Sequence, residues 1–290
     1  MATDFQEFAP AKINLCLHVT GRRGDGFHEL ESLTVFADMG DRITAAQADG
    51  LELEISGPMG AGLSAEEDNL VLRAARALSA AAGIRAEARL HLEKHLPIAG
   101  GIGGGSADAA AALRALNRLW RLGLAPDELH EIAGGLGADV PACLISRPLI
   151  MRGIGERLEK LDGFPGLHLV LVNPHIAAAT PQVFRALNWQ KQRAAPPLPA
   201  LPAALTPDKL TLWLRESGND LERAAMQLAP QIGGVLDALG ALPGCRLARM
   251  SGSGTTCFGL FTDAAAADAA AAELAHAKPQ WWVRAVTTGS

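Results

Sequence analysis

Five glycines occupy six consecutive positions, from Gly100 to Gly105, and a helix is predicted directly after them at residues 106–121. Glycine lets the backbone bend and approach a ligand with no side chain in the way. The free N–H groups and the positive dipole end of the helix would point at whatever the loop surrounds, and phosphate suits that environment. We therefore predict a phosphate-binding loop, with Ser106 as the N-cap of the helix.

This glycine loop differs from two common nucleotide-binding patterns. It lacks the Gly-Lys-Ser/Thr ending of a Walker loop, and Ser106 stands where the dinucleotide-binding pattern has its third glycine. A flexible turn is the alternative, but such a turn seldom runs straight into an amphipathic helix. The residues favour phosphate binding by a loop of neither type.

A lysine and an asparagine share one face of a predicted strand. Residues 11–19 alternate between apolar and other side chains, which is typical of a half-buried strand. Lys12 and Asn14 then lie about 7 Å apart along that face. A solvated lysine and a hydrogen-bonded strand asparagine are the ordinary alternatives to a functional pair.

Three further features could carry chemistry. Asp139, between Gly137 and Pro141, could accept a proton from an alcohol, although on spacing alone an ordinary turn aspartate is the more common case. Phe27 could stack on a base and His28 could pair with its polar edge, although such a pair is more often packing. Residues 250–256 predict a second glycine turn between strand-like segments.

The elements that must position these residues alternate without a strict βα rhythm, which favours an α+β fold. Two helices are expected besides 106–121: one begins at an Asp68 cap and closes at Gly83, and one spans 264–277. Residues 196–202 are proline-rich and predict a connector. Further strands are expected at 51–55, 86–92, 170–172, 258–261 and 281–286.

Composition excludes several classes of protein. The 290 residues carry a net charge of −5 with scattered cations, which argues against a general nucleic-acid binder. Four separated cysteines predict inert thiols in a reducing cytosol. The N-terminus is acidic and no apolar run reaches the roughly 20 residues of a membrane span, so we expect a cytoplasmic protein.

Four motifs, in order, give the chain a resemblance to the GHMP kinases that extends from about residue 8 to 261. They are residues 9–15 with 26–30 downstream, the glycine loop, residues 137–141 and residues 250–256. The resemblance implies a two-domain α+β fold with ATP and an acceptor alcohol in the interdomain cleft. It implies an N-terminal domain, 1–150, with the ATP loop and catalytic residues, and a C-terminal domain, 151–290, on the substrate side.

The implied reaction transfers the γ-phosphate of ATP, accompanied by Mg²⁺, to the 2-hydroxyl of 4-diphosphocytidyl-2-C-methyl-D-erythritol. This is a step of the non-mevalonate isoprenoid pathway. The expected partner is thus a small molecule carrying cytidine diphosphate, with no nucleic acid or membrane, and with the protein as a monomer or weak homodimer.

The resemblance also implies roles for individual residues. Asp139 would be the general base, and Lys12 beside it would favour the ionised carboxylate and stabilise the developing alkoxide. Ser106 would reach the metal. The implied ATP site consists of Asn69, Lys94, Pro97, Ile98, Ala99, Gly100, Gly101, Ile102, Gly103, Gly104, Gly105, Ser106, Ala107 and Asn117. The implied acceptor site consists of Asn14, Phe27, His28, Thr180, Phe184, Ser251, Gly252, Ser253, Gly254 and Thr255.

Several of these expectations have alternatives. Asn69, Lys94 and Asn117 could instead be capping or surface polar residues. The chain also departs from the family pattern, with Phe27 where tyrosine is frequent, Ile102 and Ala107 for leucine and serine, and Thr255-Thr256 for serines. Another GHMP kinase, for homoserine, a sugar or mevalonate, is the alternative enzyme. A non-catalytic nucleotide-binding protein of this fold is the other alternative, and the presence of both Lys12 and Asp139 argues against it.

Overall fold

The computed structural model describes residues 4–66, 68–189 and 194–289. The chain forms two compact units that alternate along the sequence. Unit 1 comprises Met1–Ala11, Met39–Ile98 and Gly103–Ser146, and unit 2 comprises Lys12–Asp38, Ala99–Ile102 and Arg147–Ser290. Two strands, β1 (Phe5–Asn14) and β3 (His28–Ala46), contribute residues to both units. The expected functional division at residue 150 stays a prediction.

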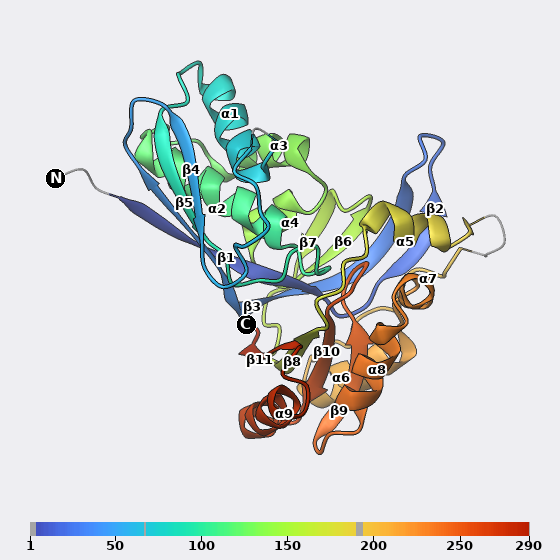
Figure 1. Ribbon diagram of the computed structural model, residues 1–290. Coiled ribbons are helices and arrows are strands. Elements are labelled where there is room, and N and C mark those ends of the chain that lie inside the picture. The colour runs from blue at the N-terminus through green and yellow to red at the C-terminus, as the bar shows by residue number, and fades with distance from the viewer. Residues whose placement is uncertain (1–3, 67, 190–193, 290) are drawn as a thin grey trace. The chain divides into compact units, whose positions relative to one another are not determined.

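Unit 1 contains part of a seven-stranded sheet, covered by helices (Figure 1). In it β5 pairs in parallel with β4 and antiparallel with the last residues of β3. Helix α1 packs on α2, and α2 packs on α4. The elements that lie wholly in this unit are β4 (Leu51–Ser56), α1 (Leu70–Ala82), β5 (Ala88–Glu93), α2 (Gly104–Leu119), α3 (Pro126–Leu136) and α4 (Val140–Ile145).

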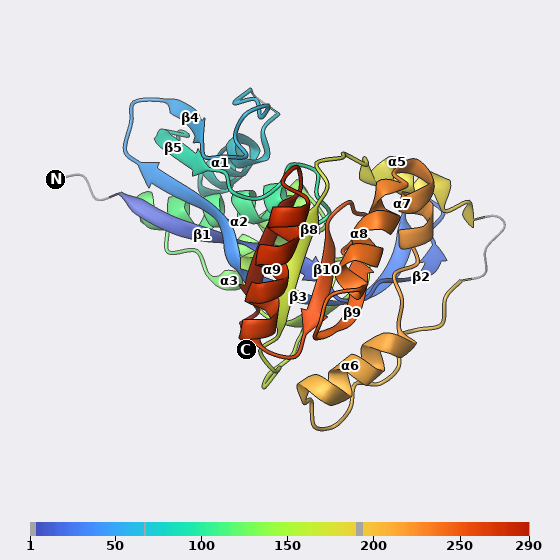
Figure 2. The ribbon, with the colours of Figure 1, turned by 60° about the horizontal axis from the view of Figure 1, so that its bottom comes forward.

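Unit 2 contains strands of two sheets, a seven-stranded sheet to which β4 and β5 also belong and a separate four-stranded sheet. In one, the first residues of β3 pair with β2 and with β6, and β6 pairs with β7; the other has the order β11-β8-β10-β9. Figure 2 shows α9 lying along β8, and α9 also packs on β11. The elements are β2 (His18–Arg22), β6 (Leu149–Gly153), β7 (Arg157–Lys160), β8 (His168–Asn173), α5 (Thr180–Ala186), α6 (Pro207–Glu216), α7 (Glu222–Leu228), α8 (Gln231–Gly240), β9 (Cys245–Met250), β10 (Cys257–Phe261), α9 (Ala264–Ala277) and β11 (Trp282–Thr287).

Local sequence explains the elements that were expected. Strand β4 alternates between half-buried leucine or isoleucine and exposed polar side chains. Strand β8 is apolar without alternation because both of its faces are covered, so Leu169–Val172 are all buried. Helix α9 buries one stripe, Ala267, Ala270 and Leu274. The predicted strands 51–55, 86–92, 170–172, 258–261 and 281–286 and the helix 264–277 are confirmed within one or two residues.

Three local predictions are wrong. The N-cap of α1 is Asn69, whose side chain accepts from the Val71 N–H, and not Asp68; Gly83 closes the helix as predicted. Helix α2 begins two residues earlier than expected, directly after Gly103. The left-handed φ of 65° at Gly103 is not helical, so the helix cannot extend back through this residue. The segment 11–19 is not one half-buried strand: β1 ends at Asn14, β2 begins at His18, and both faces are buried.

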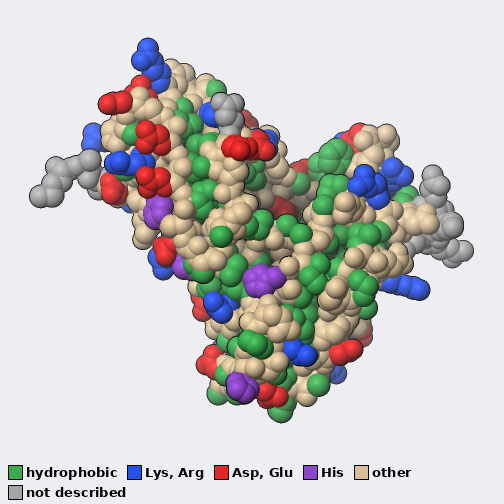
Figure 3. Space-filling view, in the orientation of Figure 1, with side chains coloured by type: hydrophobic (Ala, Val, Ile, Leu, Met, Phe, Trp, Pro, Cys, Tyr) green, Lys and Arg blue, Asp and Glu red, His purple; other side chains and the backbone are tan. Residues whose placement is uncertain are grey.

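The surface and the cysteines agree with the composition. On the face drawn in Figure 3, cationic and anionic side chains are scattered and do not gather into a basic stripe. No disulfide joins Cys16, Cys143, Cys245 or Cys257. Burial raises the pKa of Cys16 to about 11 and also raises the pKa of Cys245 and of Cys257, so these three thiols are poor nucleophiles. Among the described residues, no helix has both the length and the apolar character to cross a membrane.

Candidate active site

The start of α2 presents an anion-binding end. The first intrahelical bond runs from the Ala107 N–H to the Gly103 carbonyl (2.8 Å), so the N–H groups of residues 103–106 precede it. Ser106, half-buried, is the third helical residue rather than the cap. The side chains of Ile102 and Ala107 are fully buried, so these two residues can offer a ligand only their backbone. The predicted phosphate-binding loop is thus followed by a helix start, as required, and that helix begins two residues earlier than predicted.

The two predicted glycine turns lie against each other in unit 2. Residues 251–256 of the second glycine turn connect β9 to β10. The Thr256 N–H donates to the Gly100 carbonyl (2.9 Å), and the Ser251 hydroxyl donates to the Gly101 carbonyl (3.1 Å). A Cβ atom on Gly101 would lie 2.5 Å from the Gly254 carbonyl oxygen. The sequence predicted two separate turns, whereas the fold makes them one assembly.

This close approach gives a testable expectation for Gly101→Ala. The new Cβ would collide with backbone at a φ of 73°, which alanine adopts only with strain. We expect a loss of about 1–3 kcal/mol in the free energy of unfolding, measured by urea denaturation. Gly134→Ala is the control: this helical glycine in α3 has open space around its Cβ position, so about 0.5–1 kcal/mol should be gained. Equal effects in the two variants would contradict the close-packing argument.

The predicted acceptor residues of the second glycine turn are anchored by their own side chains. The Asn14 N–H donates to the Ser251 hydroxyl (3.1 Å). The hydroxyls of Thr180 and Ser253 lie 2.8 Å apart, which brings together two residues that the sequence places 73 positions from each other. The amide of Asn14 itself donates to side-chain hydroxyls of β3, at Ser32 (2.7 Å) and Thr34 (3.2 Å).

His28 lies in an aromatic cluster. Its ring stacks on Phe184 (centroids 4.9 Å apart, planes at 24°) and meets the edge of Trp189 (5.6 Å, 79°). Burial and the nearby charge of Arg22 lower the pKa of His28, and its Nε2 atom is buried without a hydrogen-bond partner among the described residues. Phe27 is 60 % exposed, so the ring stacked on Phe184 is that of His28. A base held between Phe27 and Phe184 stays a prediction.

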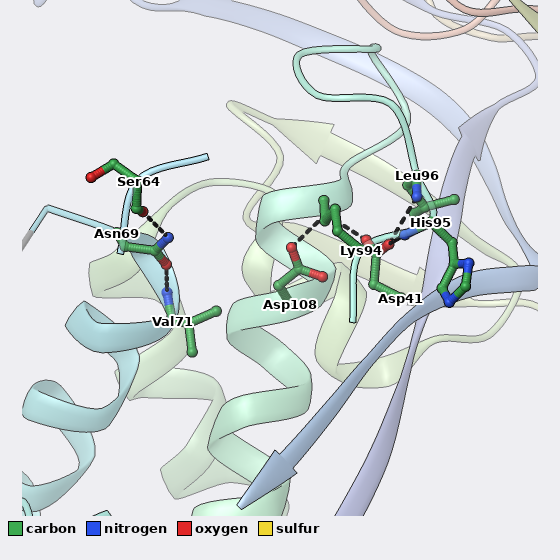
Figure 4. A network of polar contacts seen from close by, with 8 residues as sticks. All are labelled: Asp41, Ser64, Asn69, Val71, Lys94, His95, Leu96 and Asp108. Atoms are coloured by element: carbon green, nitrogen blue, oxygen red, sulfur yellow. Dashed lines mark hydrogen bonds and ion pairs between the residues drawn. The ribbon is translucent and has the colours of Figure 1, made fainter. Parts of the chain in front are cut away.

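Lys94 is the centre of a buried ion cluster in unit 1. Figure 4 shows its amine between two carboxylates, with Nζ 2.5 Å from Asp41 and 2.6 Å from Asp108. The second oxygen of Asp41 accepts the N–H groups of His95 and Leu96, which fixes the segment that leads into the glycine loop. A Cβ atom on Gly104 would lie 3.2 Å from Nζ, so the amine reaches the first turn of α2.

The electrostatics of this cluster follow from one cation between two buried carboxylates. Burial raises the pKa of Asp108 to about 8, because the charge of Lys94 does not fully offset desolvation and the neighbouring Asp41. Burial lowers the pKa of Lys94, but the two carboxylates outweigh it and the net shift is upward. Lys94 is therefore a buried cation, and the alternative of a surface lysine is wrong.

Asn69 and Asn117 have structural roles. Asn69 caps α1 and also donates to the Ser64 carbonyl (2.9 Å), as seen in Figure 4. Asn117 bonds twice to the backbone of Leu124 and so fastens the turn that follows α2. Their part in a nucleoside pocket stays a prediction.

The two predicted catalytic residues lie on different elements. Lys12 belongs to unit 2, near the end of β1, and is 4 % exposed. Asp139 belongs to unit 1 and is the half-buried N-cap residue of α4, although its side chain makes no cap bond to that helix. Their joint role in catalysis stays a prediction.

Sequence reasoning missed Asp41 and Asp108 in the ion cluster of unit 1, and it missed Trp189 and Asn219 in unit 2. Asp108 had a signal, because a lone carboxylate interrupts the alanine-rich run that follows the glycine loop. Asp41, Trp189 and Asn219 gave no signal in the sequence, because the residues that they contact are distant along the chain.

Comparisons with known proteins agree with this arrangement. The GHMP kinases N terminal domain matches residues 69–147, and the GHMP kinases C terminal domain matches residues 202–280. The 4-diphosphocytidyl-2-C-methyl-D-erythritol kinase of Parvibaculum lavamentivorans is 52 % identical over 289 residues, covering 100 % of both chains.

Solved structures show the same fold. A crystal structure of a 4-(cytidine 5'-diphospho)-2C-methyl-D-erythritol kinase is 36 % identical with a TM-score of 0.79, covering 98 % of this chain and 100 % of that one. The homoserine kinase of Cytophaga hutchinsonii has a TM-score of 0.73 at 18 % identity, covering 99 % and 94 %, a likeness of fold alone. The chain belongs to the GHMP kinase family, and within it to the 4-diphosphocytidyl-2-C-methyl-D-erythritol kinases.

Proposed function

We propose that the protein transfers the γ-phosphate of ATP to the 2-hydroxyl of 4-diphosphocytidyl-2-C-methyl-D-erythritol, a step of the non-mevalonate isoprenoid pathway. The observation that carries this proposal is 52 % identity over the full chain to a kinase named for that acceptor. The aromatic cluster around His28 supports it, because homoserine and mevalonate have no base to stack on such rings.

Separate sets of residues bind ATP and the acceptor. The N–H groups of residues 103–106 hold phosphates of ATP at the start of α2, with the positive dipole end of the helix facing them. The second glycine turn receives the diphosphate of the acceptor, and His28 with Phe184 receives the cytosine. Asp139 takes the proton of the acceptor hydroxyl, and the cation of Lys12 stabilises the alkoxide that forms.

Magnesium fits the oxygen donors at the start of α2. Among the described residues no cluster of three or more His, Cys, Asp or Glu side chains could hold a metal ion. Mg²⁺, however, needs few protein ligands when phosphates supply the rest, and it would neutralise phosphate charge. The Ser106 hydroxyl and the buried Oδ1 of Asp108, which has no hydrogen-bond partner among the described residues, are the hard oxygen atoms near this helix end.

The decisive experiment is a panel of acceptors. We expect the purified protein to form ADP from ATP only with the diphosphocytidyl alcohol, with the new phosphate monoester seen by ³¹P NMR. Homoserine, galactose and mevalonate are the comparison acceptors, and a preparation carrying Asp139→Asn controls for a contaminating kinase. Equal turnover on homoserine or galactose would contradict the proposed acceptor. Location in the cytoplasm and a monomer or weak homodimer stay predictions.

A further inference from the structure

The segment 219–222, which leads from the loop after α6 into the first residue of α7, bonds through three polar side chains to other parts of unit 2. Asn219 donates from Nδ2 to the carbonyls of Met250 (2.8 Å) and Gly252 (2.8 Å). Glu222 accepts the Met250 N–H (2.9 Å), so both backbone groups of Met250 are held from this segment. Asp220 accepts the N–H of Val19 in β2 (2.7 Å).

The amide of Asn219 has a defined orientation. Two carbonyl oxygens can only accept, so the nitrogen must face Met250 and Gly252. The oxygen then accepts the Leu221 N–H (3.0 Å). Both donors and the acceptor of this side chain are used.

The second glycine turn needs this contact because of how its residues are anchored. Ser251, Ser253 and Thr255 are fixed by bonds of their own hydroxyls, to partners at Asn14, Thr180 and the Ile176 carbonyl. Gly252 has no side chain, and its φ of 55° is a conformation that glycine adopts easily. A bond from the Gly254 N–H to the Ser251 carbonyl (2.9 Å) closes the turn but does not contact its central peptide, so the bond from Asn219 is what holds the Gly252 carbonyl in its orientation.

Holding the Gly252 carbonyl also orients the next N–H. In a planar trans peptide the C=O and the following N–H point in opposite directions, so a fixed Gly252 carbonyl fixes the Ser253 N–H. That N–H has no hydrogen-bond partner among the described residues, and Ser253 is buried. A backbone N–H in a turn with left-handed residues on either side, Gly252 and Gly254, is a donor suited to an anion.

We propose that Asn219 is a positioning residue for the acceptor: by holding the Gly252 carbonyl it aims the Ser253 N–H at the acceptor's diphosphate. This inference rests on the proposed function, in which the second glycine turn receives that diphosphate. It assigns to Asn219 a role in acceptor affinity and none in ATP affinity.

The test is Asn219→Asp, which keeps the shape of the side chain and replaces the donating nitrogen with an oxygen that repels both carbonyls. We expect the KM for the acceptor to rise about tenfold or more, as for a lost hydrogen bond to a charged group. The KM for ATP should stay within about twofold. Gln227→Glu is the matched control, because it makes the same amide-to-acid change at an exposed position on α7 and should leave both constants unchanged.

A second variant and a binding measurement separate positioning from general damage. Asn219→Ser is neutral and covers the case in which Asn219→Asp fails to fold. Titration calorimetry with cytidine diphosphate should show weaker binding for the folded variant, and hydrogen exchange should be faster at residues 251–254. Unchanged binding of cytidine diphosphate, or an equal rise in both KM values, would overturn the inference.

Failure of the role proposed for Asn219 can be distinguished from failure of the proposed function. A wild-type protein that phosphorylates the diphosphocytidyl alcohol, with variants that match its acceptor KM, overturns the role of Asn219 alone. A wild-type protein that binds cytidine diphosphate but phosphorylates another alcohol overturns the proposed function, and weaker binding by the variants then still supports the role of Asn219.

Discussion

Replacing Asp139 with asparagine is expected to lower kcat by about 10²–10⁴-fold, the usual contribution of a general base. Asparagine keeps the size of the side chain but cannot take the proton of the acceptor hydroxyl. Because Asp139 is the N-cap residue of α4 and makes no cap bond with its side chain, the change should leave that helix intact. Steady-state kinetics with the diphosphocytidyl alcohol measures the loss in kcat. Calorimetry measures nucleotide affinity separately and checks that the site is intact.

Asp127→Asn is the matched control for this variant. Asp127 also lies at the start of a helix, in the first turn of α3, but it is exposed and has no proposed contact with a reactant. We expect its kcat to be that of the wild type. Near-normal turnover in Asp139→Asn would remove Asp139 from the role of base, and loss of ATP binding would point to a damaged site instead.

Replacing Lys94 with methionine is expected to cost about 3–5 kcal/mol in the free energy of unfolding. Methionine fills a similar volume but leaves the carboxylate of Asp41 buried with no cation beside it, and Asp108, whose pKa is raised to about 8, loses its charged hydrogen-bond partner. Urea denaturation at neutral pH measures the loss. Lys160→Met, at an exposed position in β7, is the control and should change stability by no more than about 0.5 kcal/mol.

A double substitution shows whether the charge imbalance is the cause. Lys94→Met combined with Asp41→Asn removes the carboxylate that the first substitution leaves unpaired, so the double variant should be less destabilised than the sum of the two single variants. Strict additivity, or a loss in Lys94→Met no larger than in Lys160→Met, would contradict the buried cluster as a source of stability.

Much of the fold could be predicted where a short segment carries its own pattern. The alternation in Leu51–Ser56 and the fully apolar run in β8 were sufficient to predict both strands. Strand β3 was missed, although it is 19 residues long, because burial along it changes as it passes from one unit to the other. The cap of α1 was misplaced by one residue because Asp68 and Asn69 are equally good caps by type. The cap of α2 was misplaced by three because Ser106 is a better cap by type than Gly103.

The glycine loop shows where the sequence stops being informative. By itself the sequence determined that residues 100–105 precede a helix and suit phosphate, because backbone freedom and a helix start are properties of neighbouring residues. It could not show that Gly101 packs on Gly254. Nor could it show that Lys94 is paired with Asp41, 53 positions away, or that Asn219 holds Gly252. Only the tertiary structure decided those contacts, because ion pairs and hydrogen bonds form between whichever polar groups the folded chain brings within reach.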